Sequence, residues 1–171
     1  IIVLTWLFLS IKQHYNRVAK QLRLHDHIER QNYTGNTVIV LVGNVTRVSV
    51  GAMSYACSIG DEVVAMHVST AETAEKDAEV AEDFAAYFPD IRFETVTTSY
   101  RNIISPTVQY VIKVAKRAKK EGRTVTVLVP QFIPKKRWQN VLHNQMSLKL
   151  KYYLKWYEDV VVASYSYHLK E

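Results

Sequence analysis

Residues 37–43 read TVIVLVG, an uninterrupted run of β-branched and aliphatic side chains that ends at a glycine. A run without polar alternation is typical of a strand that is buried on both faces of a parallel sheet. Similar apolar runs occur in EVVAMHV at 62–68, TVTVLV at 124–129 and DVVVASYSYHL at 159–169. RFETVTT at 92–98 alternates instead, which predicts an edge strand. The sequence therefore predicts five strands.

Helical patterns separate these strands. Pro106 suits the first turn of a helix, and Gly60 and Gly122 suit helix ends. A chain in which strands and helices alternate predicts an α/β fold with a doubly wound, five-stranded parallel sheet. The expected helices cover residues 46–59, 71–87, 106–122 and 145–156.

The composition is that of a folded protein without catalytic or metal-binding motifs. Of the 171 residues, 48% are apolar and 22% are charged, which argues against a disordered chain. The single Cys57 excludes an internal disulfide, and His25 and His27 lack a third ligand for a metal. Because no Ser-His-Asp order, carboxylate pair or phosphate-loop lysine is present, we do not expect an enzyme.

The net charge of +6 is unevenly spread along the chain. Residues 72–83 hold six acids against Lys76, whereas residues 99–157 hold thirteen Lys or Arg against Glu121. We interpret the basic run at 113–123 as a solvated helix end, where cations complement the helix dipole. The cations are not interleaved with aromatic residues along one groove, so we do not expect a nucleic acid partner.

The chain opens with the apolar stretch IIVLTWLFLSI, and basic residues follow on a continuing helical pattern. This order is typical of the cytoplasmic end of a transmembrane helix. We therefore expect residues 1–30 to be the end of a last transmembrane helix with its juxtamembrane continuation, 31–36 a linker, and 37–171 a cytosolic domain of a multi-pass protein in the cell membrane. The alternative is a helix that packs on a partner or on the domain itself.

The loop after the fourth strand, PQFIPKKRWQNVLHNQ at 130–145, has no glycine and carries three consecutive cations. Open α/β sheets bind ligands just beyond the carboxyl ends of their strands. The loop therefore predicts an anionic ligand that is held by charge and amides rather than by a glycine cradle. Trp138 fits a core anchor better than a stacking platform.

The candidate ligand-binding residues are those that this topology brings to the carboxyl edge of the sheet. Gly43 permits close approach of the backbone. Asn144, as the cap of the last helix, stands beside free N–H groups that suit a phosphate. Arg47 opposes the dipole of its own helix, which favours a role in binding. The full set is Gly43, Asn44, Arg47, His67, Arg101, Asn102, Gln131, Lys136, Arg137, His143 and Asn144.

Each of these residues also has an ordinary structural role open to it. Asn44 or Thr46 can cap the first helix of the sheet domain, and Asn144 can be a cap alone. His67 can be a satisfied histidine at a strand end. The cations of the loop at 130–145 can be solvated.

The motif AMHVS at 65–69 resembles the second strand of universal stress proteins. That resemblance implies the strand order 3-2-1-4-5, with adenine nucleotides at the ends of strands one and four. Gly43 replaces the family's aspartate at the end of strand one, the loop glycines are absent, and His143-Asn144 replaces its Gly-Ser/Thr pair. These departures argue against ATP binding in that family's manner.

Three further segments resemble the C-terminal tail of KimA-type potassium importers, which belong to the amino acid/polyamine/cation transporter superfamily: HYNRVAKQLRL at 14–24, GNVTRVSVGAMSYA at 43–56 and RWQNVLHNQ at 137–145. The resemblance implies a universal-stress-protein-like regulatory domain that forms a homodimer, needs no cofactor, and binds cyclic di-AMP to inhibit proton-coupled potassium uptake. AMP and ATP are further candidate ligands.

Two other functions remain open at this point. The domain can be a ligand-free dimerisation scaffold of a membrane transporter, for which the tyrosine-rich edge SYSYHL at 164–169 is a natural pairing surface. The third possibility is a soluble nucleotide-dependent enzyme with the same type of sheet.

Overall fold

The computed structural model describes residues 1–23, 32–71, 73–98, 102–133 and 145–168. Its chain divides into two compact units, Ile1–Asn32 and Tyr33–Glu171. The first unit contains the helix α1, Ile2–Leu22, which buries none of its side chains. Within the described ranges, no helix is both long and apolar enough to cross a membrane. The expectation of a truncated transmembrane end therefore stays a prediction.

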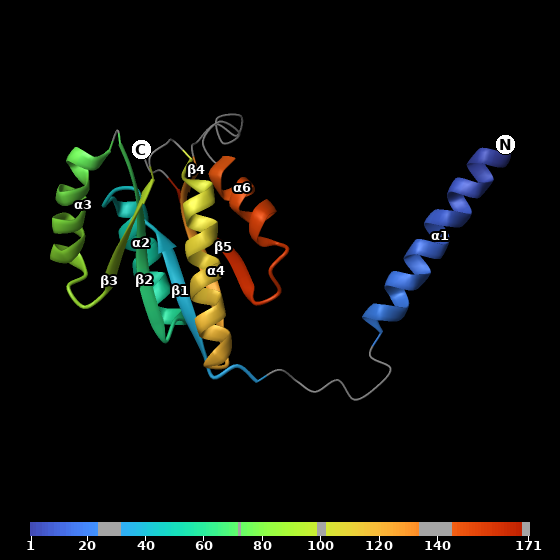
Figure 1. Ribbon diagram of the computed structural model, residues 1–171, viewed down its shortest axis with the longest axis horizontal. Coiled ribbons are helices and arrows are strands. Elements are labelled where there is room, and N and C mark those ends of the chain that lie inside the picture. Colours follow the sequence, from blue (N-terminus) through green and yellow to red (C-terminus); the bar gives the residue numbers. More distant parts are fainter. Residues whose placement is uncertain (24–31, 72, 99–101, 134–144, 169–171) are drawn as a thin grey trace. The chain divides into compact units, whose positions relative to one another are not determined.

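The second unit contains one sheet of five parallel strands in the order β3-β2-β1-β4-β5 (Figure 1). This confirms the predicted doubly wound α/β class and the order 3-2-1-4-5, with the alternating strand at one edge. The strands are β1 (Gly35–Leu41), β2 (Glu62–Thr70), β3 (Arg92–Thr98), β4 (Arg123–Ile133) and β5 (Val160–His168).

The strand β4 is longer than predicted, because the segment read as the start of a loop belongs to it. Pro130 pairs with Tyr165 of β5, and the pairing continues to Ile133 opposite His168. Proline has no N–H to offer a ladder, which is why the sequence suggested a strand end there. Pairing with the equally extended strand β5 continues β4 past Pro130.

Among the described residues, two helices cover each face of the sheet (Figure 1). The helices α2 (Arg47–Ile59) and α3 (Ala74–Tyr87) lie on one face, and α4 (Ile104–Lys120) and α6 (Gln145–Leu154) lie on the other. A capping box of Thr46 and Ser49 starts α2, which decides between the two predicted caps in favour of Thr46. After α4, Gly122 adopts a φ of 70° that favours glycine.

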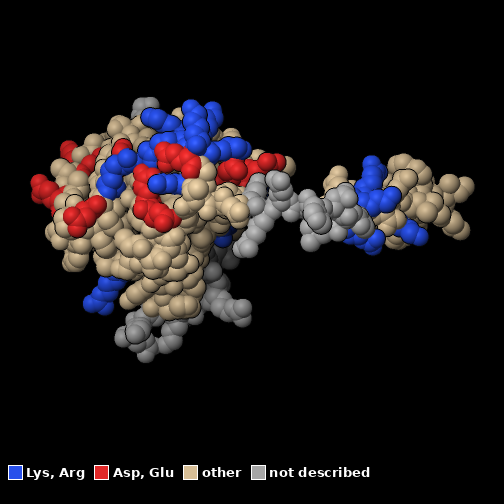
Figure 2. All heavy atoms as spheres, turned by 90° about the horizontal axis from the view of Figure 1, so that it is seen from below, with Lys and Arg blue, Asp and Glu red and all other residues tan. Residues whose placement is uncertain are grey.

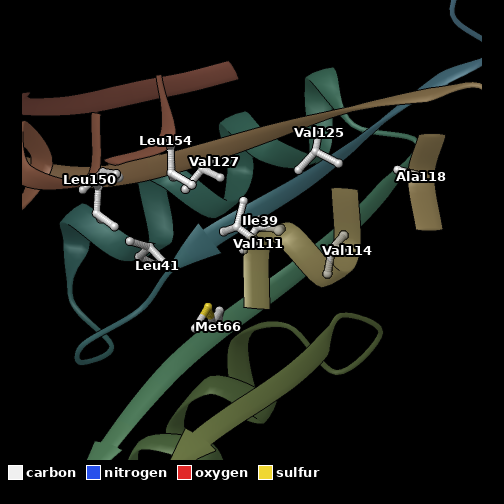
Figure 3. Close-up of a cluster of buried hydrophobic side chains, with 11 residues drawn as sticks. Ile39, Leu41, Met66, Val111, Val114, Ala118, Val125, Val127, Leu150 and Leu154 are labelled. Carbon is white, nitrogen blue, oxygen red and sulfur yellow. The ribbon is translucent and has the colours of Figure 1, made fainter. Parts of the chain in front are cut away.

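The apolar core is split by the sheet into two clusters. On the α4 and α6 side, Ile39 and Leu41 of β1 pack with residues of both helices (Figure 3). On the α2 and α3 side, Val38 and Val40 pack with residues that include Met53 and Phe84. Successive side chains of a strand point to opposite faces, so the continuous apolar run of β1 fills both clusters.

Charged side chains gather at the end of the domain where β1 begins (Figure 2). Glu62 lies 2.7 Å from Arg117 of α4, 3.4 Å from Arg123 of β4 and 3.9 Å from Arg92 of β3. One carboxylate thus bridges four elements at the end of the sheet that is opposite to the carboxyl ends of the strands.

Gly51 on α2 leaves room for a tyrosine of β5. A Cβ atom at Gly51 would lie 2.7 Å from the hydroxyl of Tyr165, whose ring packs 6.1 Å from that of Tyr55. We predict that Gly51→Ala lowers the free energy of unfolding by about 1 kcal/mol, because overpacking of about 1–3 kcal/mol exceeds the gain in helix propensity. Urea denaturation measures this change.

The matched control is Gly43→Ala, whose added Cβ atom meets nothing within 4 Å. Its unfolding free energy should stay within about 0.5 kcal/mol of the unsubstituted chain. Equal stability of the two variants would show that Tyr165 moves aside without cost, contrary to the packing described here.

Candidate functional site

A cavity of about 360 Å³ lies at the carboxyl ends of β1 and β4, within the usual size range of small-molecule sites. It occupies the point where the chain order of the sheet reverses, since β1 connects to β2 on one side and β4 to β5 on the other. Such switch points are where open α/β sheets bind ligands. The position of the cavity agrees with the edge to which the sequence assigned a ligand.

The walls of this cavity are mostly apolar. Its described polar lining consists of hydroxyl and amide side chains, and none of its described lining residues is acidic or basic. Such a surface suits a flat, weakly polar ring. The apolar lining comprises Leu41, Val42, Val48, Met66, Val68, Ile103, Val129, Pro130, Phe132 and Met146, and the polar lining Asn44, Thr46, Ser49, Thr107 and Gln131.

The rim between β1 and α2 is shaped by local hydrogen bonds. The Ser49 hydroxyl donates to the Asn44 carbonyl oxygen at 2.9 Å and accepts from the Thr46 N–H at 2.6 Å. These bonds fix the loop that carries Gly43 and Asn44, two of the predicted residues, at the cavity. Gly43 is exposed, and the space where its Cβ would stand is empty. The free volume beside Gly43 is therefore open to a ligand.

Gln131 also lines the cavity, from within β4. Its Nε2 donates to the Ser166 hydroxyl of β5 at 2.8 Å. The amide is thus held in place by the neighbouring strand. Gly43, Asn44 and Gln131 are the predicted residues that the structure brings together here.

Arg47 is the first residue of α2 and is exposed. It is not among the described lining residues, and it forms no ion pair with any residue that the structure describes. Arg47 starts the helix that borders the cavity, and its role in binding stays a prediction.

Asn102 lies elsewhere than the prediction placed it. Its Oδ1 accepts a hydrogen bond from the Ser105 N–H at 3.2 Å in the first turn of α4. It lines a groove between α4 and α6 rather than the cavity at β1 and β4. The structure shows Asn102 bonded to the start of α4, whose N-cap position is Ile103.

His67 is buried at the end of β2, with both ring nitrogens engaged. Nδ1 lies 2.8 Å from the Val42 carbonyl oxygen and Nε2 lies 3.0 Å from Oδ1 of Asp77 on α3. Both ring nitrogens of His67 therefore have a partner, one on the loop after β1 and one on α3. His67 is not among the described residues that line the cavity. It joins the end of β1 to α3.

The remaining predicted residues lie outside the described part of the chain: Arg101, Lys136, Arg137, His143 and Asn144. Their roles stay predictions. The sequence reasoning missed the apolar lining, although its signal was present. Met66 and Val68 alternate with His67 along β2, so they face the α4 side of the sheet, where the cavity lies.

The Asp77 carboxyl has a pKa below its ordinary value of 3.8. Partial burial raises this pKa, but hydrogen bonds from Ser69, His67 and Thr73, together with the positive charge of His67, lower it by more in total. The folded state therefore favours the ionised carboxylate.

Comparison with known proteins gives two matches. Residues 33–167 match the family described as the KimA potassium transporter C-terminal domain. The chain is also 41% identical over 169 residues to the potassium transporter KimA of Bacillus subtilis (strain 168), with 99% of this chain aligned. It spans 27% of the length of that relative.

We predict that Asp77→Asn lowers the free energy of unfolding by about 1–3 kcal/mol at neutral pH, because a charged hydrogen bond to His67 is lost. A depressed carboxyl pKa stabilises the fold above the unfolded value, and this contribution disappears as pH falls through the folded value. The difference between Asp77→Asn and the unsubstituted chain should therefore shrink below pH 3.8. Urea denaturation at several pH values measures it.

Glu79→Gln on the same helix is the matched control, since Glu79 is exposed and forms no ion pair with a described residue. Its effect should be within about 0.5 kcal/mol at every pH. A constant deficit of Asp77→Asn across the acidic range would contradict the assignment of an ionised Asp77.

Proposed function

The chain belongs to the family of KimA potassium transporter C-terminal domains, and on this premise we propose that it is the cytosolic regulatory domain of a potassium transporter in the cell membrane. We propose that this domain binds an adenine nucleotide and that binding inhibits transport. Cyclic di-AMP is the first candidate ligand, and AMP and ATP are the alternatives. The observation that carries this proposal is the cavity at the switch point of the sheet.

The cavity offers separate surfaces for a base and for phosphates. Val68, Val129 and Met146 contribute apolar wall on which a purine face packs well. The open side of the cavity is bounded by Gly43, and α2 begins close by at Arg47. First-turn N–H groups of a helix and an exposed guanidinium both favour an anion. An adenine inside the cavity with its phosphate toward α2 satisfies both surfaces.

Binding without turnover is the simplest chemistry for this site. A general acid or base must titrate near the working pH and reach the reacting atom. None of the described lining residues titrates in that range, and the hydroxyl of Ser49 is already engaged in the loop. We therefore propose a sensor rather than an enzyme.

A sensor needs two states to which its ligand binds with different affinity. We propose that these states are two arrangements of a homodimer, because a symmetric dinucleotide matches a two-fold axis.

The exposed edge of β5 supports the proposed dimer. The strand pairs with β4 along one side, and the structure shows no described strand along its other side. Its Val161 is 53% exposed.

The same exposed edge favours the second candidate function, a dimerisation scaffold without a ligand. In this case the cavity would be a packing defect, and nucleotides would not bind. The two functions differ in the outcome of a ligand titration.

We predict that calorimetric titration of the chain with cyclic di-AMP releases or absorbs heat with a saturable profile. Arg47→Ala should weaken binding by about 1.5–3 kcal/mol through loss of a charged hydrogen bond. Gly43→Asp should weaken it at least as much, because the new carboxylate stands in the free space at the cavity and repels a phosphate.

Lys76→Ala on α3 is the control for a lost surface charge and should bind like the unsubstituted chain. Gly43→Ala adds a small uncharged side chain in the same space as Gly43→Asp and should weaken binding less than Gly43→Asp does. AMP and ATP are titrated in parallel to identify the class of nucleotide. If none of the three nucleotides binds, the sensor is excluded and the scaffold stands.

For the dimer, we predict that Val161→Lys on β5 shifts the chain toward monomer in analytical ultracentrifugation. A two-fold contact along β5 would bring the two new charges close together, and like charges at an interface cost several kcal/mol. Val161→Thr keeps a β-branched side chain without charge and should leave the dimer intact. A chain that is monomeric at all concentrations would contradict the proposed dimer.

A further inference from the structure

The outward side of α6 combines aromatic and basic side chains. Tyr152 is 59% exposed, and Trp156, two residues after the helix ends, is 74% exposed. The Lys155 ammonium lies 4.6 Å from the ring centroid of Tyr152 and 4.8 Å from that of Trp156. We call this surface the α6 face. It consists of Leu148, Lys149, Lys151, Tyr152, Lys155 and Trp156.

A groove continues the α6 face toward α4. Its volume is about 830 Å³, and its lining includes Val108 of α4, Tyr153 of α6 and Tyr157, which follows α6. Clustered exposed aromatic side chains beside a groove are a feature of interaction sites. The α6 face is therefore a candidate contact surface.

The charges of the domain indicate the chemistry of that occupant. The helices α4 and α6 carry seven Lys or Arg and no acid, whereas α3 on the other face of the sheet carries five acids and one Lys. Two of the seven cations, Arg117 and Lys119, form ion pairs with described residues. Lys149 and Lys151 form none within the described part of the chain. These charges favour an anionic occupant.

We propose that the α6 face docks on an anionic phospholipid bilayer. Tyrosine and tryptophan are enriched at the membrane–water interface, because the apolar ring contacts lipid while the polar O–H or N–H group stays hydrated. Lysines on the same helical surface are attracted by anionic headgroups. In this arrangement Trp156 and Tyr152 lie at the level of the headgroups, and Lys149, Lys151 and Lys155 face the phosphates.

A second copy of this chain fits the α6 face less well. A two-fold contact through it would set the same lysines against each other, and like charges at an interface are unfavourable. A potassium transporter works in a membrane, so a lipid surface is close at hand for a domain of this family. The inference goes beyond the proposed nucleotide site and does not depend on it.

The test uses the full chain with Trp6→Phe and Trp138→Phe, so that Trp156 is the single tryptophan. Vesicles contain either phosphatidylcholine alone or phosphatidylcholine with phosphatidylglycerol, and a matched set carries brominated acyl chains that quench tryptophan on contact. With phosphatidylglycerol present, we expect the Trp156 emission to move to shorter wavelength and to be quenched by the brominated lipid. Added salt should reduce both effects.

Replacement of Lys149, Lys151 and Lys155 by Gln should weaken the Trp156 response to anionic vesicles about fivefold for each lysine. Lys76→Gln on α3 removes one exposed charge on the opposite face and should leave the response unchanged. Circular dichroism and the urea midpoint confirm that each variant is folded.

Two results would overturn the proposal. In the first, the chain sediments with anionic vesicles while the Trp156 emission is neither shifted nor quenched, so that another part of the chain makes the contact. In the second, the Trp156 emission shifts with protein concentration in the absence of lipid, and light scattering shows association that Lys155→Gln alters. That result assigns the α6 face to a second copy.

Discussion

In β1, Val38 and Val40 pack against the α2 side of the sheet, and Ile39 and Leu41 pack against the α4 and α6 side. All four side chains are buried. Because both faces of β1 are apolar, helices must cover the sheet on both faces, and strands must pair with β1 along both of its edges. This requirement accounts for the doubly wound arrangement. The cavity exists because this strand ends at Leu41 while β4 continues to Ile133.

The loop from β1 to α2 completes the site without any unusual backbone. At the start of α2, the backbone N–H groups of Thr46 and Ser49 each donate a hydrogen bond to the side-chain hydroxyl of the other residue. The Ser49 hydroxyl in turn donates to the Asn44 carbonyl oxygen. His67 binds the Val42 carbonyl oxygen from the neighbouring strand. The residues around Gly43 are therefore fixed from both sides, and what remains open is the space that they surround.

The sequence predicted the fold class because burial leaves a local pattern of apolar residues in each strand and helix. The strand order was implied by the resemblance of AMHVS at 65–69 to universal stress proteins. The end of β4 was not predictable in the same way, since it depends on pairing with β5 rather than on Pro130 and Phe132 themselves. Gly43, Asn44 and Gln131 were placed at the cavity from topology. The hydrogen-bond partners of His67 and Asn102 could not be predicted from the sequence, because a polar side chain at a strand or helix end can bond either to its own chain or to a ligand.

Gly43 has a practical consequence. It stands beside the cavity, it is exposed, and its missing side chain would touch nothing within 4 Å. A cysteine at this position, in a chain whose exposed Cys57 is replaced by serine, would accept a fluorescent dye without crowding the core. The dye would lie over the mouth of the cavity, where its emission reports occupancy directly. The free domain thereby becomes an optical indicator for whatever molecule enters it.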